Sequence, residues 1–145
     1  MSLQRLNPKE VEYIIIHCTA TPRGRAVTVA DVDKWHRERG FRKIGYHYLV
    51  GLDGTVYLGR ALSEIGAHCQ GSYNSKSIGI CYVGGLDEKG RPCDTRTVEQ
   101  KKAIPMLIAD IEKTFGKRLK VIGHHDVNNT KSCPCFDAKA EYANR

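Results

Sequence analysis

Two histidines stand at the ends of apolar segments that are typical of buried strands. Residues 11–17 form a β-branched run that ends in His17, and residues 119–123 lead directly into His124. Because neighbouring strands can end at one shared rim of a sheet, the two imidazoles can meet there although they are far apart in the sequence. Cys133 follows a polar loop that is long enough to fold back to this rim. Two imidazoles and a thiolate are good zinc ligands, and three protein ligands leave a fourth position open for catalysis.

The residues alone leave a second interpretation open. A histidine at a strand end is often a hydrogen-bonded surface residue, and these spacings are not among the patterns that identify a zinc site by themselves. A zinc deaminase is a poorer match. His36-Arg37-Glu38 supplies the first half of its signature, but Pro134-Cys135 is not followed by a second cysteine two residues later.

The elements that must position these residues follow from periodicity and turn signals. Their order predicts a mixed β-sheet flanked by helices, in the α/β or α+β class. A hairpin turn is expected at Leu52-Asp53-Gly54. Strands are expected at residues 11–17, 46–50, 55–58, 77–83 and 119–123, and helices at 28–39, at 98–115 and after Asp137.

Both longer helices carry start and stop signals. Thr28 with Asp31, and Thr97 with Gln100, have the spacing of capping boxes. Glycines follow both helices and favour their ends. Pro105 lies inside the second helix and is expected to bend or split it.

Length and charge limit the classes of protein. A chain of 145 residues fits one domain, for which residues 1–10 are expected to be a loosely ordered N-terminal segment. The net charge of +7 favours polyanionic partners, among them anionic wall polymers, but the scattered basic residues favour no direct nucleic-acid binding. No apolar run is long enough for membrane insertion, and no secretory signal is recognisable. We therefore expect synthesis in the cytoplasm.

The six cysteines are not expected to form a disulfide framework, because a cytoplasmic chain of this length does not need one. Cys18 and Cys81 lie in apolar runs and are expected to be buried. Cys135 is expected to be a free thiol beside the candidate ligand Cys133.

Several motifs in register resemble the type 2 N-acetylmuramoyl-L-alanine amidases, a family that includes the phage T7-type lysozymes and the peptidoglycan recognition proteins. The resemblance extends from about residue 11 to residue 137. It implies a single zinc amidase domain over residues 1–145, with the amidase and recognition-protein fold. The motifs are residues 44–50, 53–60, 66–68, 73–74, 77–80, 123–127 and 132–134.

The resemblance also implies a site. One zinc ion would be bound by His17, by His124 rather than His125, and by Cys133. Tyr46 and Lys131 occupy the positions of the residues that assist the reaction in the phage enzymes. The loop before Cys133 looks one residue longer than in those enzymes, which makes the direction of Lys131 harder to predict. His68 and Asn74 are candidates for substrate contact, and the alternative for both is a polar residue that stabilises a turn.

The implied activity is hydrolysis of the amide between N-acetylmuramic acid and L-alanine in bacterial peptidoglycan, after release of the protein to the cell wall, as in an endolysin. A receptor that only binds peptidoglycan is the alternative. Such receptors typically lack the cysteine ligand, whereas this chain has Cys133. RNA polymerase is a further possible partner, because T7-type lysozymes also regulate it.

Overall fold

The computed structural model describes residues 4–145, and a five-stranded sheet lies at its centre. The strands are β1 (Tyr13–Cys18), β3 (Tyr48–Val50), β4 (Val56–Leu58), β5 (Ser77–Tyr82) and β7 (Lys120–Gly123). Their order in the sheet is β4-β3-β5-β1-β7. β1 pairs in parallel with β5 and β7, β3 pairs in parallel with β5, and only the edge strand β4 is antiparallel.

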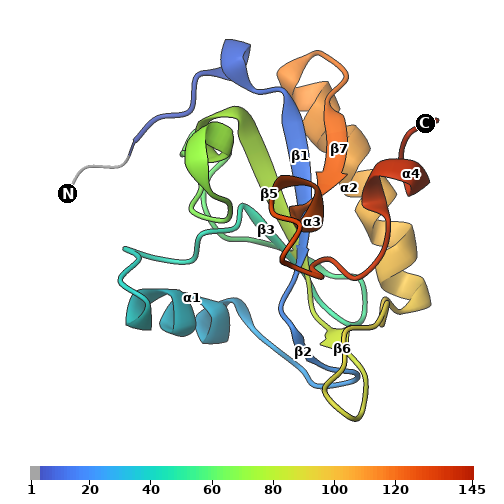
Figure 1. The fold of residues 1–145 in the computed structure, drawn as a ribbon. Helices are drawn as coiled ribbons and strands as arrows, with labels where there is room; N and C mark the ends of the chain where they lie inside the picture. The colour runs from blue at the N-terminus through green and yellow to red at the C-terminus, as the bar shows by residue number, and fades with distance from the viewer. Residues whose placement is uncertain (1–3) are drawn as a thin grey trace.

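Helices lie on both sides of this sheet (Figure 1). The predicted mixed sheet flanked by helices is therefore confirmed. Two short strands, which the sequence did not predict, form a second parallel pair. The remaining elements are η1 (Pro8–Glu10), β2 (Thr21–Pro22), α1 (Val29–Glu38), η2 (Gly71–Lys76), β6 (Gly85–Leu86), α2 (Val98–Phe115), α3 (His124–Val127) and α4 (Ala138–Glu141).

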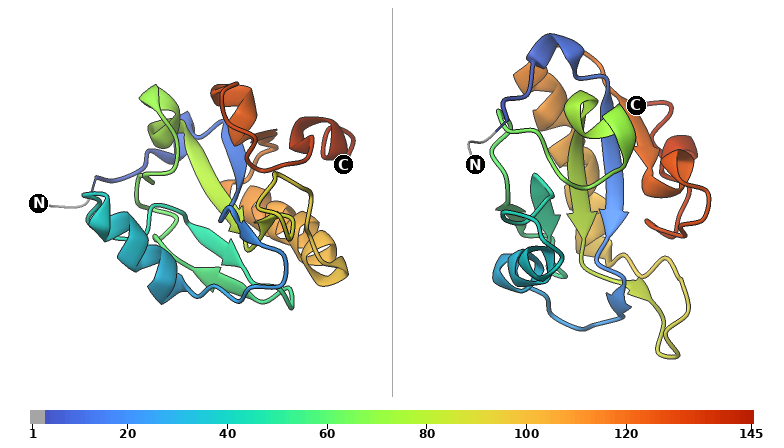
Figure 2. Two further views of the ribbon diagram at one scale, coloured as in Figure 1. Left: turned by 60° about the horizontal axis from the view of Figure 1, so that its bottom comes forward. Right: turned by 60° about the vertical axis from the view of Figure 1, so that its left-hand side comes forward.

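The two faces of the central strand β1 carry different kinds of side chain. Alternate side chains of a strand point to opposite faces, so Ile14 and Ile16 lie on one face and His17 lies on the other. The first two pack with Ile104 and Ile108 of α2 in the larger hydrophobic cluster. Figure 2 shows α2 along this face and α1 on the far side of the sheet. His17 therefore faces away from the main core.

A smaller hydrophobic cluster fixes α1 on the second side. Val32 of α1 packs there with Leu49 of β3 and Cys81 of β5, and Trp35 lies against them partly buried. Cys18 and Cys81 are both buried, as predicted. This cluster therefore holds α1 against the face of the sheet that is opposite to α2 (Figure 2).

The helix starts are those that the sequence predicts. Both capping boxes are present, Thr28 with Asp31 and Thr97 with Gln100. Pro105 does not split α2, which is one continuous helix from Val98 to Phe115, and the bend expected there stays a prediction. Pro105 lies on the exposed face, where the carbonyl that loses its helical partner can bind water instead.

The N-terminal segment is described from residue 4 onward. Residues 1–3 lie outside the described part, but the following residues make defined contacts. Leu6 is buried in the larger cluster, and the backbone of Arg5 forms an isolated antiparallel β-bridge with Glu64. Asn7 caps η1, because its Oδ1 accepts a hydrogen bond from the Lys9 amide. Burial of Leu6 thus attaches this segment to the domain, and the loosely ordered segment expected over residues 1–10 stays a prediction.

Within residues 4–145, no helix has both the length and the apolar character that crossing a membrane requires.

The packing of α2 yields a stability prediction. Ile108 is fully buried against the sheet, and Ile108→Ala should lower the free energy of unfolding by about 2–5 kcal/mol through lost burial and a residual cavity. Guanidinium unfolding at equilibrium measures this. Met106 on the same helix is 69% exposed, and Met106→Ala should change stability by no more than about 0.5 kcal/mol. Equal losses in the two variants would contradict the assigned faces of α2.

Candidate metal centre

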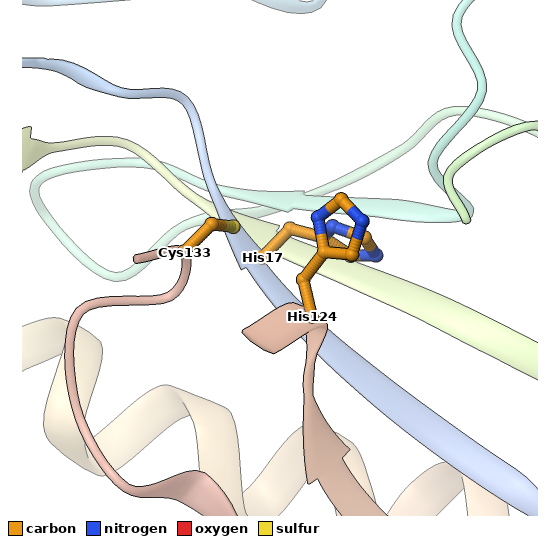
Figure 3. A group of neighbouring side chains, drawn as sticks. All are labelled: His17, His124 and Cys133. Atoms are coloured by element: carbon orange, nitrogen blue, oxygen red, sulfur yellow. The ribbon is translucent and has the colours of Figure 1, made fainter. Parts of the chain in front are cut away.

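The three side chains that the sequence singled out lie together. His17, His124 and Cys133 each offer one ligand atom, and these atoms lie within 4.8 Å of one another. Figure 3 shows the imidazole of His17 from β1, the imidazole of His124 at the start of α3, and the thiol of Cys133 from the following loop converging on one point. This separation fits three ligands of a single ion.

Strand register explains why the two histidines meet. Ile16 of β1 is paired with Gly123 of β7, so the next residues, His17 and His124, follow at the same level of the sheet. Their ring centroids are 4.7 Å apart. His17 is 1% exposed, whereas His124 is half-buried and faces the open side.

Backbone contacts hold Cys133 beside β1. The Cys18 amide donates to Cys133 Sγ at 3.1 Å, and the His125 amide donates to the Cys133 carbonyl at 2.8 Å. The next residue is also fixed, because the buried Tyr82 hydroxyl donates to the Pro134 carbonyl at 2.6 Å. The loop is thus attached to β1, to α3 and to β5.

Cys135 does not join the three candidate ligands. Its Sγ lies 3.3 Å from the Gly85 carbonyl and 4.0 Å from Cys18 Sγ. Hydrogen bonding to Cys18 and burial raise the pKa of the Cys135 thiol. It is a free thiol that points away from the centre.

Both histidines are kept neutral. Burial lowers the pKa of His17, and the nearby His68, His124 and His36 lower it further. Burial also lowers the pKa of His124, with a second contribution from the positive charge of Lys131. A neutral imidazole has a nitrogen lone pair, which metal binding requires.

An open cavity of about 350 Å³ adjoins the centre. Tyr46, His124 and Lys131 all line it, so the two predicted assisting residues lie beside a candidate ligand. Among its lining residues in the described chain there is no carboxylate. The full lining is His36, Arg39, Phe41, Tyr46, Ala67, His68, Cys69, Gln70, Asn74, His124, Asn128 and Lys131.

Tyr46 and Lys131 differ in their surroundings. The Tyr46 ring centroid is 5.1 Å from that of His17 and 5.1 Å from that of His36, and burial raises the pKa of its hydroxyl. Lys131 is exposed, and its backbone amide donates to the Asn128 carbonyl at 3.0 Å. The Tyr46 side chain and the exposed Lys131 side chain therefore line the same cavity.

His36 is not available as a base in this cavity. The Gly45 amide donates to its Nδ1 at 2.8 Å, which leaves Nε2 as the protonated nitrogen of the neutral ring. Burial, followed by the charge of Arg39, lowers the pKa of His36 to about 4. His47 lies deeper, where Nδ1 accepts from the Gly79 amide and Nε2 meets the Glu64 carbonyl.

The two predicted substrate contacts line the cavity, but their polar atoms are engaged within the protein. Asn74 Oδ1 accepts from the amides of His68 and Cys69, and its Nδ2 donates to the Cys69 carbonyl. This is the turn-stabilising alternative. His68 contacts His17 through Nδ1 and Ser77 through Nε2.

Several other lining residues were not among the site residues predicted from the sequence. Arg39, Phe41, Gln70 and Asn128 reach the cavity from loops and helix ends, which carry no periodic signal. Arg39 lies over the Phe41 ring at 5.1 Å. A larger cavity of about 500 Å³ lies between the start of α1 and the turn after β3, but His, Cys and Lys are absent from its described lining. The candidate ligand His124 and Lys131 therefore line the smaller of these two cavities.

Comparison with known proteins agrees with this geometry. Residues 7–136 match the family model described as N-acetylmuramoyl-L-alanine amidase. The endolysin of Enterobacteria phage K11 is 39% identical over 129 residues, which cover 89% of this chain and 83% of that protein.

Two solved structures have a similar fold. The amidase LysC from Clostridium intestinale has a TM-score of 0.76 and 25% identity, with 97% of this chain and 89% of that chain covered. Peptidoglycan recognition protein-LE in complex with tracheal cytotoxin, a monomeric diaminopimelic acid-type peptidoglycan, has a TM-score of 0.77 and 27% identity, with coverage of 92% and 79%.

The attachment of the loop at Pro134 can be tested. Tyr82→Phe leaves a buried carbonyl without its donor and should lower the free energy of unfolding by about 1–3 kcal/mol, measured by guanidinium unfolding. Tyr57→Phe removes the same hydroxyl from an exposed position and should change stability by less than about 0.5 kcal/mol. If both variants were as stable as the parent protein, the hydroxyl would not fix the loop.

Proposed function

The chain belongs to the N-acetylmuramoyl-L-alanine amidase family, and we propose that His17, His124 and Cys133 bind the single zinc ion that this hydrolase uses. The activity is hydrolysis of the amide between N-acetylmuramic acid and L-alanine in peptidoglycan, which leads to lysis of the cell wall. The observation that carries the zinc proposal is the convergence of three donor atoms from β1, the start of α3 and the following loop.

The residues present fit zinc in kind and in number. Two neutral imidazoles and one sulfur are ligands that zinc accepts, and three of them are typical of catalytic rather than structural sites. Partial burial excludes water from the His17 side, while His124 opens onto the cavity. Zinc bound in such a site polarises a carbonyl oxygen and lowers the pKa of water.

Lys131 is placed to stabilise the charge that the reaction generates. Attack of water on the amide carbon moves negative charge onto the former carbonyl oxygen. The Lys131 ammonium lies on the same cavity as His124 and can donate to that oxygen from its exposed side chain. One donor aimed at such an oxygen contributes about 3 kcal/mol to the transition state.

Tyr46 contributes a hydroxyl. The ordinary pKa of tyrosine is about 10 and burial raises the pKa of Tyr46, so this hydroxyl is protonated at neutral pH and can act as a hydrogen-bond donor. Its ring packs against His17 and His36, which limits its rotation. Tyr46 thus orients groups in the cavity.

We infer that the protein reaches the cell wall after release from the cytoplasm, as expected for an endolysin. Support comes from the similarity to the phage K11 endolysin over most of both chains. A contact with RNA polymerase stays a prediction.

Removal of the metal should abolish activity. The full chain should bind one equivalent of zinc, lose amidase activity in EDTA and regain it when zinc is added. Cys133→Ser should lose most of its bound zinc and at least about 100-fold in activity, because a neutral hydroxyl replaces the thiolate. Metal analysis and assay of free L-alanine amino groups released from purified peptidoglycan measure both effects.

Cys135→Ser is the matched control, with the same substitution two residues away, and should keep both zinc and activity. A protein that binds peptidoglycan without releasing amino groups would be a receptor, which would contradict the enzymatic proposal. Equal zinc loss in the two serine variants would contradict the ligand assignment.

Lys131 makes a separate prediction. Lys131→Ala should lower kcat by roughly 100- to 1000-fold while zinc content stays at one equivalent, since the lost donor acts on the transition state. Steady-state kinetics on a soluble muramoyl-peptide, together with metal analysis, measure this. Lys139 is exposed on α4, and Lys139→Ala is the control of equal charge, for which kcat should be unchanged. A loss below about threefold in Lys131→Ala would rule out this role.

A further inference from the structure

A chain of hydrogen bonds leads from the candidate ligand His17 into the interior. His17 Nε2 lies 2.8 Å from His68 Nδ1, and His68 Nε2 lies 3.3 Å from Ser77 Oγ. The Ser77 hydroxyl donates to the Tyr73 carbonyl at 2.6 Å. We propose that His68 and Ser77 are positioning residues, which keep His17 in the Nε2–H form and thereby direct its Nδ1 lone pair to the metal. This inference rests on the proposed zinc site.

The direction of each bond follows from the last one. A carbonyl oxygen only accepts, so the single Ser77 proton is used on Tyr73. The Ser77 oxygen must then accept at its other contact, which places the His68 proton on Nε2. His68 Nδ1 is left with a lone pair and accepts from His17 Nε2–H. The only lone pair remaining on the neutral His17 ring is on Nδ1.

Two glycines create the space for the His68 ring. A Cβ at Gly79 would lie 2.7 Å from His68 Cγ, and a Cβ at Gly66 would lie 2.6 Å from His68 Cδ2. Neither backbone has a positive φ, so conformational freedom does not explain the glycine at either position. What both positions require is the absence of a side chain beside the His68 imidazole.

The backbone of His68 is fixed as well. Its amide donates to Asn74 Oδ1 at 3.1 Å, and Asn74 also binds both backbone groups of Cys69. His68 is buried, and its ring stands at 87° to that of His17, with 4.9 Å between centroids. The space left by the two glycines, the backbone contacts and the hydrogen bonds of both ring nitrogens therefore all favour one orientation of the His68 ring.

This arrangement changes the role expected for His68. A substrate contact needs a polar atom that is free to face the cavity, and both nitrogens of His68 are engaged inside the protein. A metal-binding histidine commonly donates its second N–H to a neighbouring acceptor, which fixes its tautomer and ring orientation. In most such sites that acceptor is a carboxylate or a carbonyl, whereas here it is a second imidazole.

The tautomer can be read directly. Two-bond ¹H–¹⁵N correlation spectra of the full chain, before and after one equivalent of zinc, report which ring nitrogen carries the proton. We expect His17 and His68 to be protonated on Nε2 in both spectra. A proton on His17 Nδ1 in the free protein would overturn the proposal, whether or not the protein binds zinc.

Zinc affinity tests the consequence. His68→Leu should weaken zinc binding by roughly 10- to 100-fold, measured by competition with a chromophoric chelator, because His17 loses its acceptor. His68→Asn should recover part of this loss, since its amide oxygen can occupy the position of Nδ1. Parent-like affinity, within about twofold, in His68→Leu would overturn the proposal.

A serine pair separates positioning from folding. Ser77→Ala removes the acceptor of His68 and should weaken zinc binding, whereas Ser75→Ala removes a hydroxyl that donates to the Ser72 carbonyl outside this chain of bonds and should not. Equal zinc affinities of Ser77→Ala and Ser75→Ala would contradict the positioning role proposed for Ser77. If the parent protein itself bound no zinc, the zinc proposal would fail, while the tautomer measurement would still decide the hydrogen-bond assignment.

Discussion

The parallel pairing of β1 with β5 and β7 is the interaction on which the functional site depends. Pairing of Ile16 with Gly123 places His17 and His124 side by side, and pairing of Ile15 with Gly79 places a residue without a side chain beneath His68. A shift of one residue in either pairing would turn His17 toward α2 or separate the two imidazoles. The hydrophobic core that fixes this register therefore also fixes the geometry of the chemistry.

Polar groups can be buried at this site because each has a partner. His17, His68 and Ser77 are nearly inaccessible to water, and an unpaired group there would cost about 1–3 kcal/mol. The run of bonds to the Tyr73 carbonyl satisfies them one after another. On the open side, His124 and Lys131 face the cavity, where a substrate can approach.

The sequence predicts what local patterns determine. Capping boxes mark the starts of α1 and α2, apolar runs mark β1, β5 and β7, and strand-end histidines identify the candidate ligands. Patterns do not reveal features that arise only from packing: the continuous α2 around an exposed Pro105, the short α3 and the docking of Leu6. The role proposed for Ser77 is hidden in the sequence for the same reason, because its partners come from other segments. The Asn74 contacts favour the turn-stabilising interpretation, one of the two that the sequence left open.

The edges of the sheet have a consequence for association between molecules. Strand edges expose unpaired backbone groups on which a strand of another chain can add. Here the free edge is β4, which has only three residues, and at the opposite edge α4 packs beside the short β7. Although Val56, Tyr57 and Leu58 are exposed, so short an edge offers few hydrogen bonds to a neighbouring strand, which limits aggregation through sheet extension.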